Sequence, residues 1–297
     1  MTPQIKAHTG LVATNLFFAI NIGSIKHFTG NGFSGPYGLN IIRIGVSVML
    51  FWMLFAINSE KKKVDKKDIG RFLLCALSAL AINQMLFMKG LSYTYSIHAS
   101  LLLLITPILI TFIAAWILKE RLNNYKLAGL FMGITGAVIL IFNRESSGNG
   151  DNILLGDLLI ILSAFAYTFY FILVKPLMAK YPPLDVMRWV FTFGLVMIIP
   201  LGWNEFIQIP WNKFETLEYV LLFLIVVPGT FLAYIFNVYG IKILGASVAG
   251  TYIYSQPFFG VLIATLFLKE HFSLYKIIAA VFIFAGVFLA TKKVNKR

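Results

Sequence analysis

The side chains best suited to bind a solute lie inside long apolar stretches of the chain. Amide and phenol groups placed there are usually turned toward the interior of a helical bundle. They occur as Asn21, as the neighbours Asn83 and Gln84, and as the spaced pairs Tyr167/Tyr170, Tyr234/Asn237 and Tyr252/Gln256. Residues three or four apart share one helix face, so we predict that these residues line one central substrate cavity. The alternatives are hydrogen bonding between helices for the amides and packing for the aromatic rings.

Two prolines, Pro107 and Pro257, fall near the centres of two of these stretches. Proline lacks an N–H and clashes with the carbonyl four residues back, so the carbonyls of Leu103 and Ile253 lose their helical partners. An unsatisfied carbonyl in hydrocarbon costs several kcal/mol and should face a polar cavity or a neighbouring donor. We predict a hinge at each proline; the alternative is a kink without functional consequence.

A Lys-Glu pair closes the same two stretches, as Lys119-Glu120 and as Lys269-Glu270. The simplest interpretation is a solvated ion pair at each helix end. The alternative is a latch that opens and closes on opposite faces of the membrane. Neither reading requires a bound metal or cofactor, and none is expected.

Catalytic groups do not converge in the sequence. The 12 acidic residues fall in loops or near the ends of apolar stretches, and the zinc-protease, nucleophile-elbow and phosphate-loop motifs are missing. An enzyme is therefore not expected. Proton-driven carriers commonly keep a carboxylate or histidine inside the membrane. His98 looks too shallow for this role, and Asp157 and Glu270 lie near helix ends, so we predict facilitated diffusion. Coupling through Asp157 or Glu270 is the alternative.

The elements that must position these residues are membrane helices. Apolar residues make up 59% of the chain, charged residues 12%, and the mean hydropathy is +0.83; soluble domains carry about 25% charge. A membrane-spanning helix needs about 20 apolar residues. Ten such stretches occur: 8–27, 37–57, 69–89, 97–117, 125–142, 154–174, 184–203, 217–239, 247–267 and 275–291. The fold class predicted is an all-α membrane protein with ten transmembrane helices.

The net charge of +13 reflects orientation in the membrane. With both termini in the cytoplasm, seventeen basic residues lie on the cytoplasmic side and six on the outer side. Basic residues in short loops favour the cytoplasm. The charge therefore predicts cytoplasmic termini and a lipid bilayer as partner, with no role in binding nucleic acid.

The second half of the chain repeats the first. A shift of 150 residues places Leu118-Lys119-Glu120 on Leu268-Lys269-Glu270 and Pro107 on Pro257. Five helices precede the hydrophilic stretch 143–152 and five follow it. Because five is odd, the second half enters the membrane from the opposite side, which predicts two inverted repeats, 1–146 and 147–297.

These residues resemble the EamA-type branch of the drug/metabolite transporter superfamily. The resemblance rests on the run Ser96–Phe142 with Thr106-Pro107, Lys119-Glu120 and Gly129…Gly136, and on Tyr252–Pro257 followed by Lys269-Glu270. The family often has Trp-Gly near the middle of its first helix, where this chain has Phe18-Ala19. Phe18 is accordingly placed with the expected cavity residues.

The resemblance implies a secondary transporter, an exporter of small metabolites across the cell inner membrane, with amino acids and related compounds as the leading substrates. Internal repeats in a helical membrane protein are typical of carriers that work by alternating access between the repeats. Gly129 and Gly133 permit close helix contact, either within the chain or in a weak homodimer. A monomer or weak homodimer is expected. The alternative function is an integral-membrane enzyme or scaffold with the same bundle.

Overall fold

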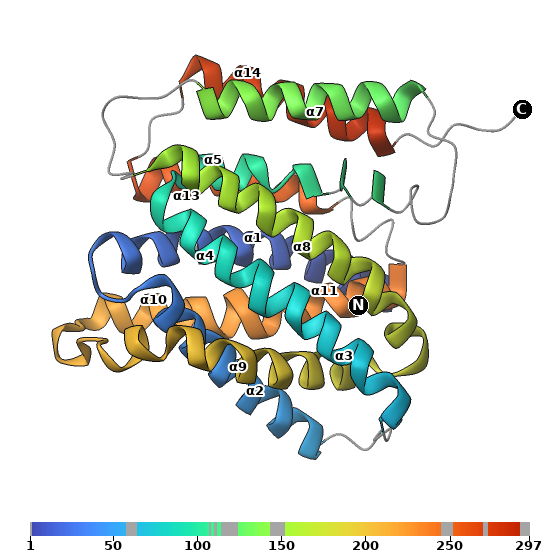
Figure 1. Cartoon of the computed structure of the whole chain (residues 1–297), viewed down its shortest axis with the longest axis vertical. Helices are drawn as coiled ribbons and strands as arrows, with labels where there is room; N and C mark the ends of the chain where they lie inside the picture. Colours follow the sequence, from blue (N-terminus) through green and yellow to red (C-terminus); the bar gives the residue numbers. More distant parts are fainter. Residues whose placement is uncertain are drawn as a thin grey trace, which may run out of the picture.

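The chain folds into a bundle of helices, seen here in a computed structural model (Figure 1). The structure describes residues 2–57, 64–106, 108–109, 112–113, 124–142, 152–244, 252–269 and 273–291. In these ranges the regular structure is entirely helical, with no strand. The α-helices are α1 (Pro3–Gly30), α2 (Pro36–Ile57), α3 (Ile69–Ala76), α4 (Asn83–Tyr93), α5 (Ser96–Leu102), α7 (Asn124–Phe142), α8 (Ile153–Lys180), α9 (Pro183–Ile207), α10 (Thr216–Val226), α11 (Ala233–Leu244), α13 (Gln256–Phe267) and α14 (Leu274–Thr291).

Five helical segments are long and apolar enough to cross a membrane. They are Pro36–Ile57, Lys66–Tyr93, Ile153–Lys180, Pro183–Ile207 and Thr216–Leu244. Shorter apolar helices cover Leu127–Ile139, Gln256–Phe267 and Leu274–Gly286. An all-helical membrane fold is thus confirmed, whereas the count of ten spans and the inverted repeat stay predictions.

Local sequence explains where several helices begin. The Thr2 side chain accepts a hydrogen bond from the Ile5 N–H and Pro3 opens α1, as expected for an N-cap followed by proline. Asn152 caps α8 through the Leu155 N–H at 3.2 Å. Helix α1 therefore starts five residues before the apolar stretch that predicted it, because the cap, and not hydropathy, sets its first turn.

Two membrane-length segments contain a π-helical turn at matching positions. The turn η2 (Leu77–Ile82) joins α3 to α4, and η4 (Val227–Leu232) joins α10 to α11, 150 positions later. In η4, Pro228 lacks an N–H and the Thr230 hydroxyl donates to the Ile225 carbonyl at 2.8 Å. π-helical turns are rare in proteins, and those that occur are frequently found at functional sites.

The helices pack in pairs drawn from both halves of the chain. Helix α4 packs on α8 and α11 on α1, while α2 packs on α9. Helices α7 and α14 lie side by side at one end of the bundle, beyond α5 and α13 (Figure 1). A Cβ atom on Gly286 would lie 2.6 Å from the Gly133 nitrogen and 2.7 Å from the Gly129 oxygen. These two glycines therefore serve a contact within the chain.

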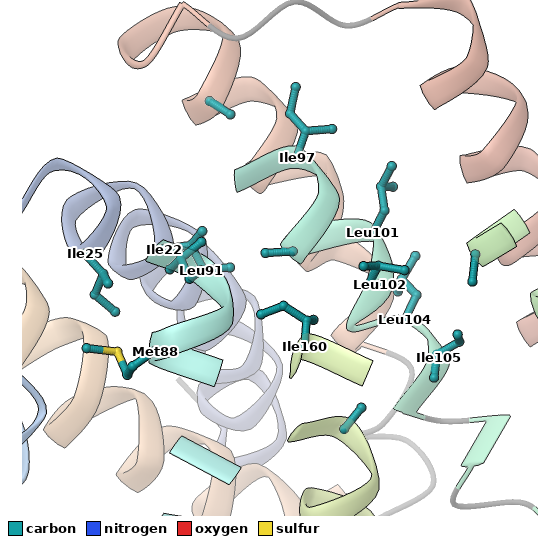
Figure 2. Packing of buried hydrophobic residues seen from close by; sticks show 14 of the residues in the cluster. Ile22, Ile25, Met88, Leu91, Ile97, Leu101, Leu102, Leu104, Ile105 and Ile160 are labelled. Atoms are coloured by element: carbon teal, nitrogen blue, oxygen red, sulfur yellow. The ribbon is translucent and has the colours of Figure 1, made fainter. Parts of the chain in front are cut away.

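Apolar side chains form both the interior and the outer surface. One buried cluster gathers residues such as Ile22, Met88, Leu101 and Ile160 from four segments of the chain (Figure 2). Outside, Met53 of α2 is 62% exposed and Phe131 of α7 is 74% exposed, with many other large apolar residues. A surface this apolar is incompatible with water on all sides and matches a bilayer.

Candidate substrate cavity

A cavity of about 140 Å³ lies between helices of both halves of the chain. Its walls come from α1, α2, α4, α8 and α11, from residues 103 and 106 after α5, and from residues 253 and 256 around the start of α13. Polar side chains reach it from most of these elements: Thr14, Asn15, Asn21, Arg43, Asn83, Gln84, Thr106, Tyr167, Tyr234, Asn237 and Gln256. The site is thus a polar space inside an apolar bundle.

Eight of the ten residues expected to form a substrate cavity lie round this one space. They are Phe18, Asn21, Asn83, Gln84, Tyr167, Tyr234, Asn237 and Gln256. Polar residues in hydrocarbon turn inward, and α1, α4, α8, α11 and α13 converge here. Their contact with a substrate remains a prediction.

Tyr170 and Tyr252 are not among the residues that line the cavity. Tyr170 belongs to the second buried apolar cluster, with its ring centroid 5.6 Å from that of Tyr167. Tyr252 lies in the 3₁₀ turn η5 (Tyr252–Ser255), and its hydroxyl is 2.5 Å from Nδ1 of His8. A 3₁₀ turn has three residues per turn, so the shared helix face expected for Tyr252 and Gln256 does not form.

The cavity amides also join helices, as the alternative interpretation proposed. Asn21 Nδ2 donates to the Gly229 carbonyl of η4 at 2.7 Å. Asn83 Nδ2 donates to the Ser163 carbonyl of α8 at 2.7 Å, and Gln84 Nε2 donates to Asn83 Oδ1 at 3.0 Å. These bonds fix which end of each amide is the acceptor.

Two acceptor oxygens of the cavity amides are left without a hydrogen bond. Oδ1 of Asn21 and Oε1 of Gln84 are buried and have no hydrogen-bond partner among the described residues. Buried polar atoms are normally paired. Two orphaned acceptors on residues that line one cavity therefore mark a place where a donor can bind.

Among the described residues that line the cavity, Arg43 is the one that carries a charge, and the sequence did not predict it there. It lies two turns inside α2 and is only 4% exposed. Its Nε donates to the Thr230 hydroxyl at 2.7 Å, and Nη1 lies 3.6 Å from the Met88 sulfur. In the described part of the chain no carboxylate forms an ion pair with it. A charged residue inside a hydrophobic stretch was the signal available from sequence, since such residues mark functional sites by default.

The matching arginine of the second half has a different environment. Arg188 of α9 pairs with Asp185 at 3.1 Å and stacks on Trp52, with its Cζ 4.5 Å from that ring centroid. The two buried arginines therefore differ in one respect that matters for binding, because only Arg188 has its charge compensated by an acid.

The proline hinges are described in part. Pro257 falls in the first turn of α13, directly after the 3₁₀ turn η5, so the helix axis is interrupted there. Pro107 lies outside the described residues. Leu103 and Ile253, whose carbonyls the prolines were expected to free, both line the cavity. Their hinge role remains a prediction.

Of the four residues in the expected helix-end ion pairs, only Lys269 is described by the structure. Lys119, Glu120 and Glu270 lie outside the described residues. Lys269 follows α13 with a positive φ of 54°. This left-handed conformation turns the chain out of the helix, so Lys269 marks the end of the segment.

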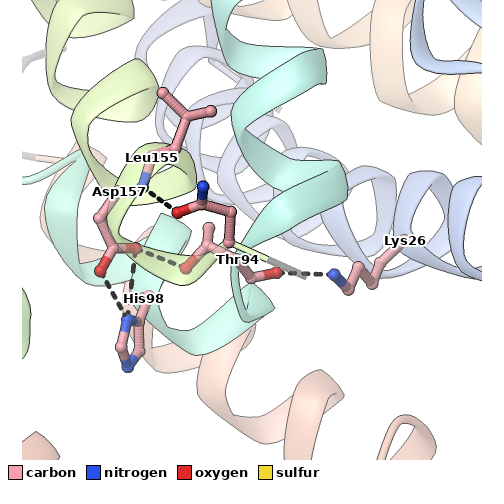
Figure 3. A network of polar contacts seen from close by, with 6 residues as sticks. Lys26, Thr94, His98, Leu155 and Asp157 are labelled. Carbon is pink, nitrogen blue, oxygen red and sulfur yellow. Dashed lines mark hydrogen bonds and ion pairs between the residues drawn. The ribbon is translucent and has the colours of Figure 1, made fainter. Parts of the chain in front are cut away.

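His98 and Asp157 are buried in the protein and contact each other. The side chain of His98 is 1% exposed and that of Asp157 is 0% exposed, and Nδ1 of His98 lies 3.0 Å from Oδ2 of Asp157 (Figure 3). Both residues are within one turn of a helix start, but the packing of α4 against α8 covers them. Both side chains are therefore shielded from solvent by the protein itself, although each lies near a helix start as the sequence indicated.

Comparison with known proteins agrees with this architecture. The sequence profile of the EamA-like transporter family matches residues 5–142 and again residues 154–292. An uncharacterized transporter of Archaeoglobus fulgidus is 24% identical over 294 residues, covering 97% of this chain and 98% of the relative. The uncharacterized transporter YetK of Bacillus subtilis is 24% identical over 250 residues, 83% of this chain and 75% of YetK.

One solved crystal structure shares the fold, with a TM-score of 0.60 and 17% sequence identity over 97% of this chain and 96% of that one. The double match of the family profile spans nearly all of the sequence, and the curated relatives are named transporters. With its apolar outer surface and internal polar cavity, this chain is a membrane transporter that belongs to the EamA-like transporter family.

Proposed function

We propose that this protein exports small organic metabolites, chiefly amino acids and related compounds, by alternating access between two inverted five-helix repeats, 1–146 and 147–297. The observation that carries the substrate class is the buried, acid-free guanidinium of Arg43 in the same cavity as two orphaned amide oxygens. An amino acid brings the two groups that such a cavity lacks.

The carboxylate end is matched by Arg43. A buried charge without a partner is expensive, and guanidinium binds carboxylate through paired, parallel hydrogen bonds. The Thr230 hydroxyl occupies Nε and supplies no negative charge. Among the described residues, Nη1 donates only to the Met88 sulfur, a weak acceptor. A solute carboxylate on Nη1 and Nη2 would neutralise the guanidinium and give it stronger directional partners.

The ammonium end is matched by Asn21 and Gln84. An ammonium group has three donors and no acceptor, so it needs oxygens. The free Oδ1 and Oε1 atoms supply neutral acceptors. No described acid lines this cavity. A solute with a net positive charge would add to the positive charge of Arg43 and is therefore disfavoured, whereas a zwitterionic solute adds no net charge.

The walls away from these groups are aromatic. Phe18, Phe87, Tyr167, Phe171 and Tyr234 line the cavity, and the Phe18 and Tyr234 rings meet edge to face with centroids 5.9 Å apart. Apolar walls with a few placed polar groups are typical of small-molecule sites. They favour solutes with an apolar side chain.

Alternating access is supported by features that recur at a fixed spacing. The π turns η2 and η4, and the cavity residues Leu103/Ile253 and Thr106/Gln256, are each 150 positions apart. Carriers built from repeats place their site at the repeat interface, where broken helices meet. A two-fold relation would let one repeat rock against the other around this cavity.

The proposal includes a cell inner-membrane location with both termini in the cytoplasm, in keeping with the basic residues of the loops. The protein would act as a monomer or weak homodimer, with a small solute and the bilayer as its partners and no nucleic acid. No cofactor takes part in the cycle.

The test is counterflow in liposomes. Vesicles containing the purified protein and a high internal concentration of one unlabelled L-amino acid are exposed to a trace of the same labelled solute. A panel of amino acids and their decarboxylated amines is compared with empty vesicles. We expect transient accumulation of amino acids with apolar side chains and not of the amines. Absence of counterflow for every amino acid would refute the proposed function.

A further inference from the structure

A second polar site lies outside the cavity, where α8 meets the turn between α4 and α5. Asp157 accepts hydrogen bonds at both oxygens: the Thr94 hydroxyl donates to Oδ1, and Oδ2 lies 3.0 Å from Nδ1 of His98 (Figure 3). Both acid and imidazole are buried. The transport cycle proposed above makes no use of them.

The geometry of this pair sets the tautomer of the imidazole when Asp157 is ionised. An ionised carboxylate can only accept hydrogen bonds, so in that state Nδ1 of His98 carries a hydrogen that it donates to Asp157. In the neutral ring Nε2 then bears a lone pair. That atom is buried and has no hydrogen-bond partner in the described parts of the chain. The ring therefore holds an empty proton position inside the protein.

We propose that His98 and Asp157 form a proton-binding site that couples transport to the proton gradient, in place of the facilitated diffusion that the sequence predicted. One proton from water adds to the Nε2 lone pair and forms an N–H bond, giving an imidazolium beside the carboxylate. The net charge of the pair changes from −1 to zero. Release of the same proton to water completes the step, so that one proton is bound and one is released in each cycle.

The surroundings of the pair favour both of its charge states. The protonated pair is neutral, and the deprotonated pair lies near cations. Nζ of Lys26 in α1 donates to the Thr94 carbonyl at 2.7 Å. Lys276 of α14 lies with its Nζ 5.1 Å from the Tyr95 ring, which is itself 5.3 Å from the His98 ring. The groups facing the pair are thus two lysines and one phenol, with no second described acid.

Close packing of α8 against the end of α4 keeps solvent away from the pair. A Cβ atom on Gly156 would lie 2.8 Å from the Gly90 oxygen and 2.8 Å from the Thr94 nitrogen. Glycine at this position lets α8 approach the end of α4 closely enough for the Thr94 hydroxyl to reach Asp157. Polar groups sealed at a helix junction in this way can sense a movement of either helix.

The helices that carry the pair also contribute to the cavity wall, so protonation of the pair can change the packing around the cavity. Ala164, seven residues after Asp157 on α8, lines the cavity, a separation of about 10 Å at the helical rise. Leu103 follows α5, the helix that carries His98, and also lines it. Protonation strengthens the ion pair that joins these two elements, and deprotonation weakens it. Each state would favour a different packing of α5 against α8.

The first measurement needs no substrate. Wild-type protein in nanodiscs of phosphatidylethanolamine and phosphatidylglycerol is titrated between about pH 5 and about pH 8, the range in which histidine ordinarily titrates, and followed by infrared difference spectroscopy. We expect an imidazole transition and a change in the Asp157 carboxylate band, both absent in His98→Gln. A wild-type titration identical to that of His98→Gln would overturn the proton site.

The second measurement tests coupling. Liposomes with an imposed pH gradient and zero membrane potential receive a mixture of labelled neutral L-amino acids. We expect uphill accumulation by wild type, loss of accumulation in Asp157→Asn, and recovery in Asp157→Glu. Asp185→Asn is the matched control: it removes another buried carboxylate and breaks the pair with Arg188, so its stability should fall, but the folded protein should keep the accumulation. Retained accumulation in Asp157→Asn would contradict the coupling.

Failure of this inference is separable from failure of the proposed function. Counterflow at equal pH requires no proton gradient, so wild-type counterflow without any response to the gradient refutes the coupling alone. Loss of wild-type counterflow for all amino acids refutes the substrate assignment, while the infrared titration still decides whether the pair binds a proton. If Asp157→Asn fails to fold, His98→Gln serves in both measurements.

Discussion

Replacing Arg43 by glutamine should lower affinity for the solute and raise the stability of the protein. The guanidinium is 4% exposed and has no acid partner in the described chain. Removing it relieves the burial of an uncompensated charge, while the glutamine amide can still donate to Thr230. Apparent thermal stability in detergent should therefore hold or increase without substrate.

The loss in affinity follows from the bonds expected to the carboxylate. Hydrogen bonds to charged groups are worth about 1.5–3 kcal/mol, which corresponds to roughly a 10- to 150-fold weaker affinity. The half-saturating concentration in counterflow should rise by that factor for an amino acid. The concentration of the corresponding amine that inhibits this counterflow by half should change little, because that compound lacks the carboxylate and has no partner for Arg43.

Arg188→Gln is the matched control, for which we expect lower stability and an unchanged affinity. This arginine is also buried but is paired with Asp185 at 3.1 Å. Breaking a buried pair by removing one partner costs about 3–5 kcal/mol, so the apparent melting temperature should fall while the solute affinity of the folded fraction stays constant. If Arg43→Gln leaves affinity unchanged, or weakens amino acid and amine equally, the reasoning about the guanidinium is refuted.

Three further predictions concern packing, the hinge and orientation. Gly156→Ala places a Cβ 2.8 Å from two backbone atoms, and overpacking should lower stability by about 1–3 kcal/mol; Gly70→Ala, with nothing within 4 Å, should not lower it in the same thermal unfolding assay. Pro257→Ala restores an N–H in the first turn of α13 and should slow counterflow without loss of folding; an unchanged rate would exclude the hinge. Reporter fusions after Lys63 and after Asn149 should lie on opposite sides of the membrane, and matching signals would contradict both the ten-helix count and the inverted repeat.

Much of the helical architecture follows from the sequence, because apolar stretches of about 20 residues have few alternatives in a bilayer. Asn21, Asn83 and Gln84 could be assigned to one space for a related reason: amides in hydrocarbon turn inward. The π turn η2 could not be predicted, since Leu77–Ile82 extends an apolar pattern without a change of composition. In η4 the residues Pro228 and Gly229 interrupt the pattern, but they do not specify a π turn.

The burial of Arg43 and of Asp157 could not be predicted from the sequence, and the physical reason is the same for both. Each lies near the end of an apolar stretch, where a charged side chain ordinarily reaches the membrane surface. Helix α2 begins at Pro36, seven residues before Arg43, or about 10 Å along the axis. Asp157 is covered because Gly90 and Gly156 bring two helix backbones together. Such coverage depends on contacts between distant segments, which hydropathy along one stretch does not contain.

The most direct test of the account is an experimental structure determined with a saturating concentration of an amino acid that gives counterflow. We predict density in the cavity with the carboxylate about 3 Å from the Arg43 guanidinium and the ammonium group beside Oδ1 of Asn21 and Oε1 of Gln84. Density for the solute outside this cavity, or inside it with the carboxylate turned away from Arg43, would contradict the central claim.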